Sequence, residues 1–191
     1  MESRLVGGDK WRGEDGPLRL ETGPASNPLF GAWLEAGPQA GFERTDDVNG
    51  FRQEGFAAFD KNMVRGRRLS AARAYLHPVL KRKNLTLRTL AQVNKILFEG
   101  TRAVGVEYRR GRRTQIAKGA EIISCGGAFN SPQLLQLSGI GDATHLQSLG
   151  IDSVVDLPGV GANLQDHLEV YIQYSCKEPV SMQPYLAKWR M

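Results

Sequence analysis

A glycine-rich run in the second half of the chain has residue types that bring a backbone close to a ligand. Gly126 and Gly127 directly follow the apolar segment 120–125, and glycine leaves room for ligand atoms beside the chain. Ser131 and Pro132 come next, and these types are favoured at the N-cap and first turn of a helix. The pattern predicts a strand, a glycine turn and a helix whose free N–H groups and positive dipole end face the ligand. A strand packed on a helix without any ligand is the alternative.

Few other side chains suggest chemistry. The three histidines are His77, His145 and His167; we expect a structural role for His77 and a solvated surface position for His145. The two cysteines, Cys125 and Cys176, have neither metal-site spacing nor a disulfide framework. A reducing compartment is therefore the default expectation.

A second glycine motif, the segment 159–164, matches only the first two glycines of the dinucleotide pattern G-x-G-x-x-G. Leu164 stands at the third glycine position, and the segment follows no strand–turn–helix unit of the right kind. We therefore do not expect a dinucleotide to bind there.

Composition narrows the classes of function. The chain has 191 residues, of which 41% are hydrophobic, and a net charge of +5, so it can build a packed core. Four arginines surround Gly111, at positions 109, 110, 112 and 113; a solvated hairpin tip is the preferred interpretation and nucleic-acid contact the alternative. Because no recognition motif accompanies them, we expect no nucleic-acid partner. No stretch reaches the roughly 18 apolar residues of a membrane span, and residues 1–10 have no signal-peptide pattern.

The first half of the chain predicts two helices around a long loop. Asn27 and Pro28 mark the start of the first helix, with Leu29, Phe30, Trp33 and Leu34 on one face and an end or kink at Gly37–Pro38. The second covers 70–81, with Tyr75, Leu76, Val79 and Leu80 inward and a distortion at Pro78. The polar stretch 41–69 between them is typical of a functional or partner-covered loop.

The middle of the chain predicts β structure. A short strand is expected at 85–90, then a meander of 93–98, 103–108 and 114–118, then a buried strand at 120–125. We expect 85–90 and 120–125 to lie side by side in one parallel sheet, joined by the meander. A short helix at 142–149 and a strand at 153–157 follow, and 171–176 is a weaker strand. A parallel sheet needs more strands than these, so we expect the chain to be an internal fragment.

Several motifs resemble one family, the glucose-methanol-choline (GMC) oxidoreductases. The run from Gly126 to Gly141 resembles the second signature of that family over sixteen residues. The segment 157–167 is similar to its next stretch, as are the loop with Asp47, Asn49, Gly50 and Glu54 and the segments 66–70 and 75–76. The likeness covers about residues 15 to 180, and the wording at 98–108 and 166–169 is most similar to the choline dehydrogenase branch.

The resemblance implies a mixed α/β fold: part of a doubly wound FAD-binding domain with a β-meander crossover, plus part of a substrate-binding domain. It implies FAD as the cofactor, with Val93 holding the adenine through its backbone and Gly126, Gly127 and Ala128 lying along the cofactor. The flavin takes the hydride from an alcohol. The implied division is 1–82 for a substrate-domain segment and cofactor-covering loop, 83–150 for part of the FAD domain, and 151–191 for the start of the substrate domain.

In the choline-oxidising branch, the Asp-His-x-Glu stretch enters the substrate pocket. Carried onto this sequence, His167 and Glu169 become substrate-binding residues, with the glutamate facing the trimethylammonium group of choline. An acid and aromatic rings suit a permanent cation, and Tyr171 and Tyr174 are nearby. A salt-bridged surface acid is the alternative for Glu169, and a structural hydrogen-bond acceptor is expected of Asp166.

The sequence departs from the family in lacking the opening glycine loop for the FAD pyrophosphate and the C-terminal catalytic segment. We therefore expect no catalytic residue in this chain and no activity from it alone. The rivals are a GMC enzyme for a neutral alcohol, which Glu169 argues against, and a truncated, non-catalytic binding module. By resemblance, we expect a location at the mitochondrial inner membrane if the chain comes from an animal. The alternative is a bacterial enzyme that is cytoplasmic or associated with the membrane. The electron acceptor and the oligomeric state stay open.

Overall fold

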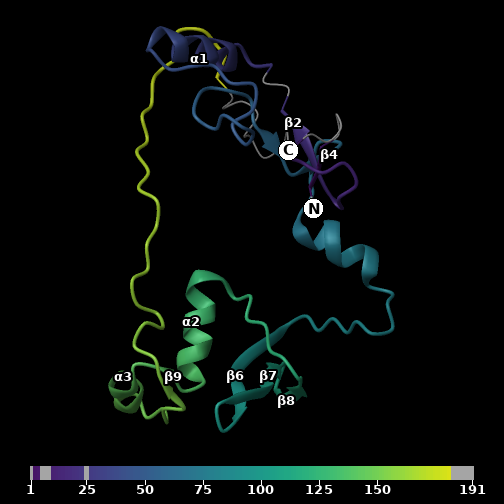
Figure 1. Ribbon diagram of the computed structural model, residues 1–191, viewed down its shortest axis with the longest axis vertical. Helices are drawn as coiled ribbons and strands as arrows, with labels where there is room; N and C mark the ends of the chain where they lie inside the picture. The colour runs from purple at the N-terminus through teal and green to yellow at the C-terminus, as the bar shows by residue number, and fades with distance from the viewer. Residues whose placement is uncertain (1, 5–9, 24–25, 182–191) are drawn as a thin grey trace. The chain divides into compact units, whose positions relative to one another are not determined.

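The computed structural model contains two compact units (Figure 1). It describes residues 2–4, 10–23 and 26–181. One unit comprises Met1–Thr86 with Ile172–Met191, and the other is Leu87–Tyr171. Within the described residues, no helix has the length and apolar character that a bilayer span requires.

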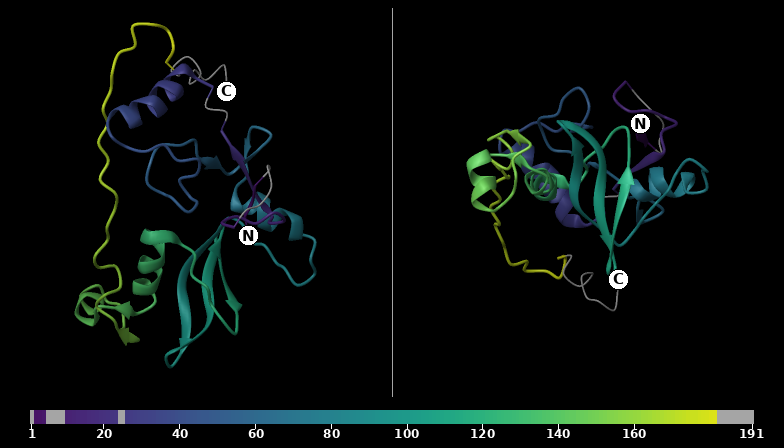
Figure 2. Two further views of the ribbon diagram at one scale, coloured as in Figure 1. Left: turned by 45° about the horizontal axis from the view of Figure 1, so that its top comes forward. Right: turned by 90° about the horizontal axis from the view of Figure 1, so that it is seen from below.

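A three-stranded antiparallel meander forms the sheet of the second unit. Its strands are β6 (Ala91–Glu99), β7 (Arg102–Arg110) and β8 (Arg113–Lys118), in that order. They run side by side in all views (Figures 1 and 2). Gly100 and Gly111 each have a φ of 60°, which suits the two-residue turns that match the twist of a hairpin. The predicted meander is confirmed, and Arg112 lies at the exposed tip between β7 and β8.

The two strands predicted beside the meander are not formed. Residues 85–90 and 120–125 have no strand assignment, and most of their side chains are exposed. A strand is held by hydrogen bonds to a neighbouring strand, and neither segment has such a neighbour among the described residues. The predicted parallel pairing of the two segments, and the burial of 120–125, are therefore wrong for this structure.

Helix α2 (Gly127–Leu137) packs against β6. It begins four residues before the predicted N-cap, with Gly126 as N-cap and Pro132 inside the helix. Instead of capping, the Ser131 hydroxyl accepts a hydrogen bond from the Gly126 N–H at 2.9 Å. The interior position of Pro132 removes only the bond to the carbonyl of Ala128, in the first turn.

The second unit closes with three short elements. These are β9 (Ile140–Gly141), α3 (Ala143–Ser148) and β10 (Val155–Asp156), and β9 pairs with β10 in parallel. Asp142 caps α3, since its carboxylate accepts a hydrogen bond from the His145 N–H at 2.7 Å. The helix predicted at 142–149 and the strand within 153–157 are confirmed, whereas 171–176 has no strand.

Helix α1 (Pro28–Gln39) of the first unit starts where the sequence predicts. Asn27 is its N-cap, and its side-chain carbonyl accepts from the Leu29 N–H at 2.9 Å. The helix continues through Pro38 rather than ending there. Its apolar face borders a hollow of about 340 Å³ that also contacts the segment before β3.

Short strands precede and follow α1 in the sequence. They are β1 (Glu2–Arg4), β2 (Leu18–Thr22), β3 (Asp60–Lys61), β4 (Met63–Val64) and β5 (Arg67–Arg68). β2 pairs with β1 in parallel and with β3 in antiparallel, and β4 pairs with β5. Part of the predicted loop 41–69 is therefore strand.

The predicted second helix is short and irregular. It consists of a π-helical turn (Ala72–Leu76) and a 3-10 turn (His77–Val79), in keeping with the distortion expected at Pro78. Its buried residue is Ala74, whereas Tyr75 is 43% exposed. The predicted inward face is therefore wrong at Tyr75 and also at Leu80, which is 42% exposed. A π turn places side chains differently from an α turn.

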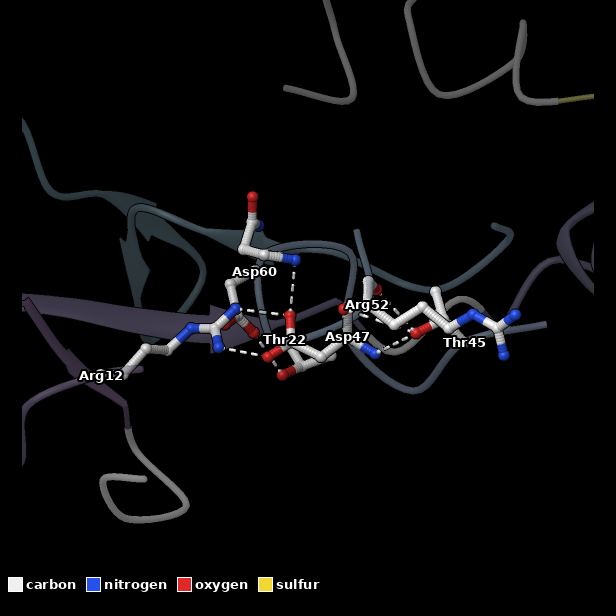
Figure 3. Close-up of polar contacts among 7 residues, drawn as sticks. Arg12, Thr22, Thr45, Asp47, Arg52 and Asp60 are labelled. Carbon is white, nitrogen blue, oxygen red and sulfur yellow. Dashed lines mark hydrogen bonds and ion pairs between the residues drawn. The ribbon is translucent and has the colours of Figure 1, made fainter. Parts of the chain in front are cut away.

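A buried ionic cluster anchors the loop of the first unit (Figure 3). Arg12 lies between two carboxylates: its guanidinium donates to both oxygens of Asp47, and its Nε is 2.9 Å from Asp60 Oδ2. The Thr22 hydroxyl donates to Asp60 Oδ1 at 2.7 Å. The Arg12 and Asp60 side chains are each 4% exposed. Removing one partner would leave a buried charge unpaired, so the cluster fixes this loop to β2.

Candidate functional site

A hollow of about 550 Å³ lies between the meander and the start of α2. The meander contributes Val93 and Val106, and the segment from Glu121 to Gly126 forms another wall. Val93 is half-buried. The structure thus brings Val93 and Gly126, two of the predicted cofactor residues, to one cavity.

The turn into α2 leaves its backbone accessible. Gly127 has a φ of +81°, and a Cβ atom built there would meet nothing within 4 Å. A positive φ disfavours any other residue, and the open space allows a ligand to reach the backbone. Ala128 follows in the first turn of the helix. The free N–H groups of that turn favour the binding of an anion. Gly127 and Ala128 are placed at the turn but not in the lining of the cavity.

These features fit part of FAD. A cavity with Val93 and Val106 on one wall suits a flat ring, and an open glycine turn suits close approach of the cofactor chain. The side chains of Gln92, Asn130 and Gln133 also line the hollow and carry donors and acceptors for a ring edge. Sequence reasoning missed these three. Asn130 and Gln133 are three residues apart and follow the glycines at the predicted start of a helix. This spacing places two side chains on one face of a helix, and it is the signal that could have found them.

The second glycine motif, the segment 159–164, forms a turn that contacts α2. Gly159 and Gly161 lie in a turn after β10, and no helix follows them within the described chain. The Gln136 side chain donates to the Val160 carbonyl at 3.0 Å, which ties this turn to α2. Within the described residues the segment is thus a turn tied to α2 rather than a strand–turn–helix unit.

The segment with Asp166, His167 and Glu169 is extended and exposed. Side chains two residues apart on an extended chain share a face, and the Tyr171 hydroxyl donates a hydrogen bond to Glu169 Oε2. This bond, and to a lesser degree desolvation, raises the pKa of Tyr171 above its ordinary 10.0. The His167 N–H donates to the carboxylate of Asp166 at 2.8 Å.

The hollow beside Val93 does not include His167 or Glu169 in its lining. The two groups of predicted residues therefore form separate features of the same unit. Among the described residues there is no grouping of three or more potential metal ligands. His145 is exposed, as expected.

Comparison with known proteins identifies relatives of the chain. Residues 5–169 match the GMC oxidoreductase family. The oxygen-dependent choline dehydrogenase of Staphylococcus aureus strain MSSA476 is 60% identical over 183 residues, which are 96% of this chain and 32% of that protein. The protein of the same name from Staphylococcus saprophyticus is 58% identical over 183 residues, or 33% of its length. The chain thus spans about a third of the length of these relatives.

Solved structures of similar fold point to the same family. Pyridoxine 4-oxidase from Mesorbium loti is 33% identical with a TM-score of 0.78, over 83% of this chain and 31% of that one. An FAD-dependent oxidoreductase from Chaetomium thermophilum is 27% identical with a TM-score of 0.73, over 83% of this chain and 30% of that one. The likeness confirms the mixed α/β fold and the relation to FAD-binding enzymes. The chain therefore belongs to the GMC oxidoreductase family, whose cofactor is FAD.

Proposed function

We propose that this chain is part of an FAD-dependent choline dehydrogenase, which oxidises choline to betaine aldehyde in the synthesis of glycine betaine. The observation that carries the proposal is the 60% identity to the staphylococcal oxygen-dependent choline dehydrogenase over 96% of the chain. In this function FAD, when bound, accepts the hydride released by alcohol oxidation. No catalytic group is assigned to this chain.

The cofactor contacts proposed for the chain are Val93 and the turn Gly126–Gly127–Ala128. The backbone of Val93 holds the adenine, and the turn lies along the cofactor. In support, Val93 and Gly126 line one hollow, and Gly127 leaves open space beside a backbone of positive φ. By this proposal, residues 83–150 serve the FAD domain.

The substrate contacts proposed for the chain are Glu169 and His167. The Glu169 carboxylate faces the trimethylammonium group, which charge opposition and aromatic faces hold. In support, the Tyr171 hydroxyl already donates to this carboxylate, which orients it on an exposed strand-like segment. By this proposal, 151–191 begin the substrate domain and 1–82 contribute a substrate-domain segment and the loop over the cofactor.

The alternatives are a GMC enzyme for a neutral alcohol and a non-catalytic binding module. An acid at position 169 favours a cationic substrate over a neutral one. The relatives are named oxygen-dependent choline dehydrogenases, which makes dioxygen the electron acceptor to test first. The relatives compared are bacterial, which favours the bacterial location over the mitochondrial one; membrane association of a full-length enzyme is a further proposal.

A chimera tests the function directly. In the Staphylococcus aureus enzyme, the matching 183 residues are replaced by those of this chain, and bound flavin and oxidation rates are measured. We expect about one flavin per chain and faster turnover of choline than of the neutral isostere 3,3-dimethylbutanol. A flavin-loaded chimera that prefers the neutral alcohol would support the first alternative, and a folded chimera without flavin the second.

A further inference from the structure

A second cavity, in the first unit, is rich in arginine. It has a volume of about 720 Å³, and its lining includes Arg19, Arg65, Arg67 and Arg73. The carboxylate that shares the lining is Asp15. All four arginines are exposed. The described part of the chain shows no ion pair for any of the four.

Three separate elements bring these arginines together. Arg19 is on β2, which lies beside β4 and the π-helical turn (Figure 1). Arg65 is in the tight turn between β4 and β5, Arg67 is on β5, and Arg73 is in the π-helical turn. Arg19 is far from the other three arginines in the sequence of the first unit, so it is the tertiary structure that brings all four to one cavity.

Local contacts hold the cavity wall in place. Arg65 has a φ of 50°, a conformation uncommon outside glycine, and its N–H donates to Glu21 Oε1 at 2.6 Å. Arg73 donates from Nη1 to the Arg68 carbonyl at 3.0 Å. Two of the four positions are therefore fixed by hydrogen bonds that use one backbone N–H and one guanidinium nitrogen. The remaining donors of the guanidinium groups are available to a ligand.

We propose that this arginine cavity binds a phosphate-bearing anion. Four like charges around one cavity repel each other, and a bound anion relieves that repulsion. The planar guanidinium fork matches phosphate oxygens in a bidentate geometry. The lining carboxylate of Asp15 and the Glu21 carboxylate beside the Arg65 N–H stand against four guanidiniums, so an excess of positive charge remains, which favours a multiply charged anion over a monocarboxylate. The group is supplied by a soluble phosphate compound or by the head group of an anionic phospholipid.

The test uses the 191-residue chain and inorganic pyrophosphate as the probe, by isothermal titration calorimetry at fixed ionic strength. The variant is Arg19→Gln with Arg67→Gln, whose side chains make no hydrogen bond within the described residues. The matched control is Arg112→Gln with Arg113→Gln, which removes the same charge at the β7–β8 tip. We expect the cavity variant to weaken binding at least about tenfold and the control to change it less than about twofold.

A vesicle arm distinguishes the two sources. Sedimentation with phosphatidylglycerol vesicles, against phosphatidylcholine vesicles, reports lipid binding by the same proteins. Loss of vesicle binding in the cavity variant alone assigns the lipid head group, and pyrophosphate binding without vesicle binding assigns a soluble ligand. No binding in either arm, or equal loss in the cavity and control variants, overturns the proposal.

A charge-preserving variant guards against a folding defect. Arg19→Lys with Arg67→Lys keeps the charge but loses the bidentate fork, so we expect it to bind pyrophosphate more weakly than the parent and more tightly than the glutamine variant. Circular dichroism checks that all variants retain the parent spectrum. A lysine variant that keeps the parent spectrum and binds as weakly as the glutamine variant would show that positive charge at these positions does not hold the anion, which contradicts the site. The test is independent of choline oxidation.

Discussion

At the scale of single residues, Glu169 is the position where charge decides substrate choice. In the chimera, Glu169→Gln keeps the shape of the side chain and removes its charge. We expect the KM for choline to rise about tenfold or more, because a contact with a charged partner is lost. The KM for 3,3-dimethylbutanol should barely change, since that substrate has the same shape without the charge. Steady-state kinetics with both alcohols is the measurement. Equal losses with both would make Glu169 a scaffold or surface acid.

The phenol of Tyr171 reports the neighbouring carboxylate. The hydrogen bond to Glu169 raises the pKa of Tyr171 above 10.0, so the folded chain favours the neutral phenol. The stabilisation from this bond is present below pH 10.0 and is lost as the pH rises through the folded pKa. Glu169→Gln should lower this pKa toward its ordinary value. Ultraviolet titration of tyrosinate, with Tyr171→Phe to assign the signal, measures it. An unchanged titration curve would mean that the two groups are not coupled in solution.

At the scale of elements, one buried hydroxyl joins α2 to the meander. Ser138 is 7% exposed, its Oγ accepts from the Ile96 N–H at 2.8 Å, and it donates to the Leu134 carbonyl. Ser138→Ala leaves the Ile96 N–H without a partner, so we expect a loss of about 1–3 kcal/mol in the free energy of unfolding.

Urea denaturation measures this loss, and Ser148→Ala is the matched control. The Ser148 hydroxyl donates to the His145 carbonyl on an exposed surface, where water replaces the lost partner, so its removal should cost less than about 0.5 kcal/mol. Similar losses for both variants would show that the hydrogen bond between Ser138 and Ile96 makes no specific contribution to the free energy of unfolding.

At the scale of the whole molecule, cofactor retention depends on more than the hollow beside Val93. Most of the N–H groups that bind a pyrophosphate come from a glycine loop of the G-x-G-x-x-G kind, and the segment 159–164 does not form one. We expect the purified 191-residue chain to retain far less than one FAD per chain. Absorbance near the flavin bands, relative to protein concentration, is the measurement. A yellow protein with one flavin per chain would contradict this expectation.

The sequence by itself determined the elements whose stability is local. The Asn27 cap of α1 and the glycine turns of the meander depend on neighbours a few residues away, and they form as predicted. The short helix predicted at 142–149 also forms, and the structure adds Asp142 as its N-cap. The family also follows from sequence, because the motif between Gly126 and Gly141 is contiguous.

Only the tertiary structure decided the features that need a distant partner. The segments 85–90 and 120–125 have strand-like composition, but they stay unpaired because no neighbouring strand lies beside them in the described chain. The meeting of Val93 with Gly126, and the gathering of four arginines around one cavity, depend on how β strands and turns fold back on one another. Sequence patterns report the periodicity of a single element, whereas these sites arise from contacts between elements, and that is why the sequence alone did not reveal the arginine cavity.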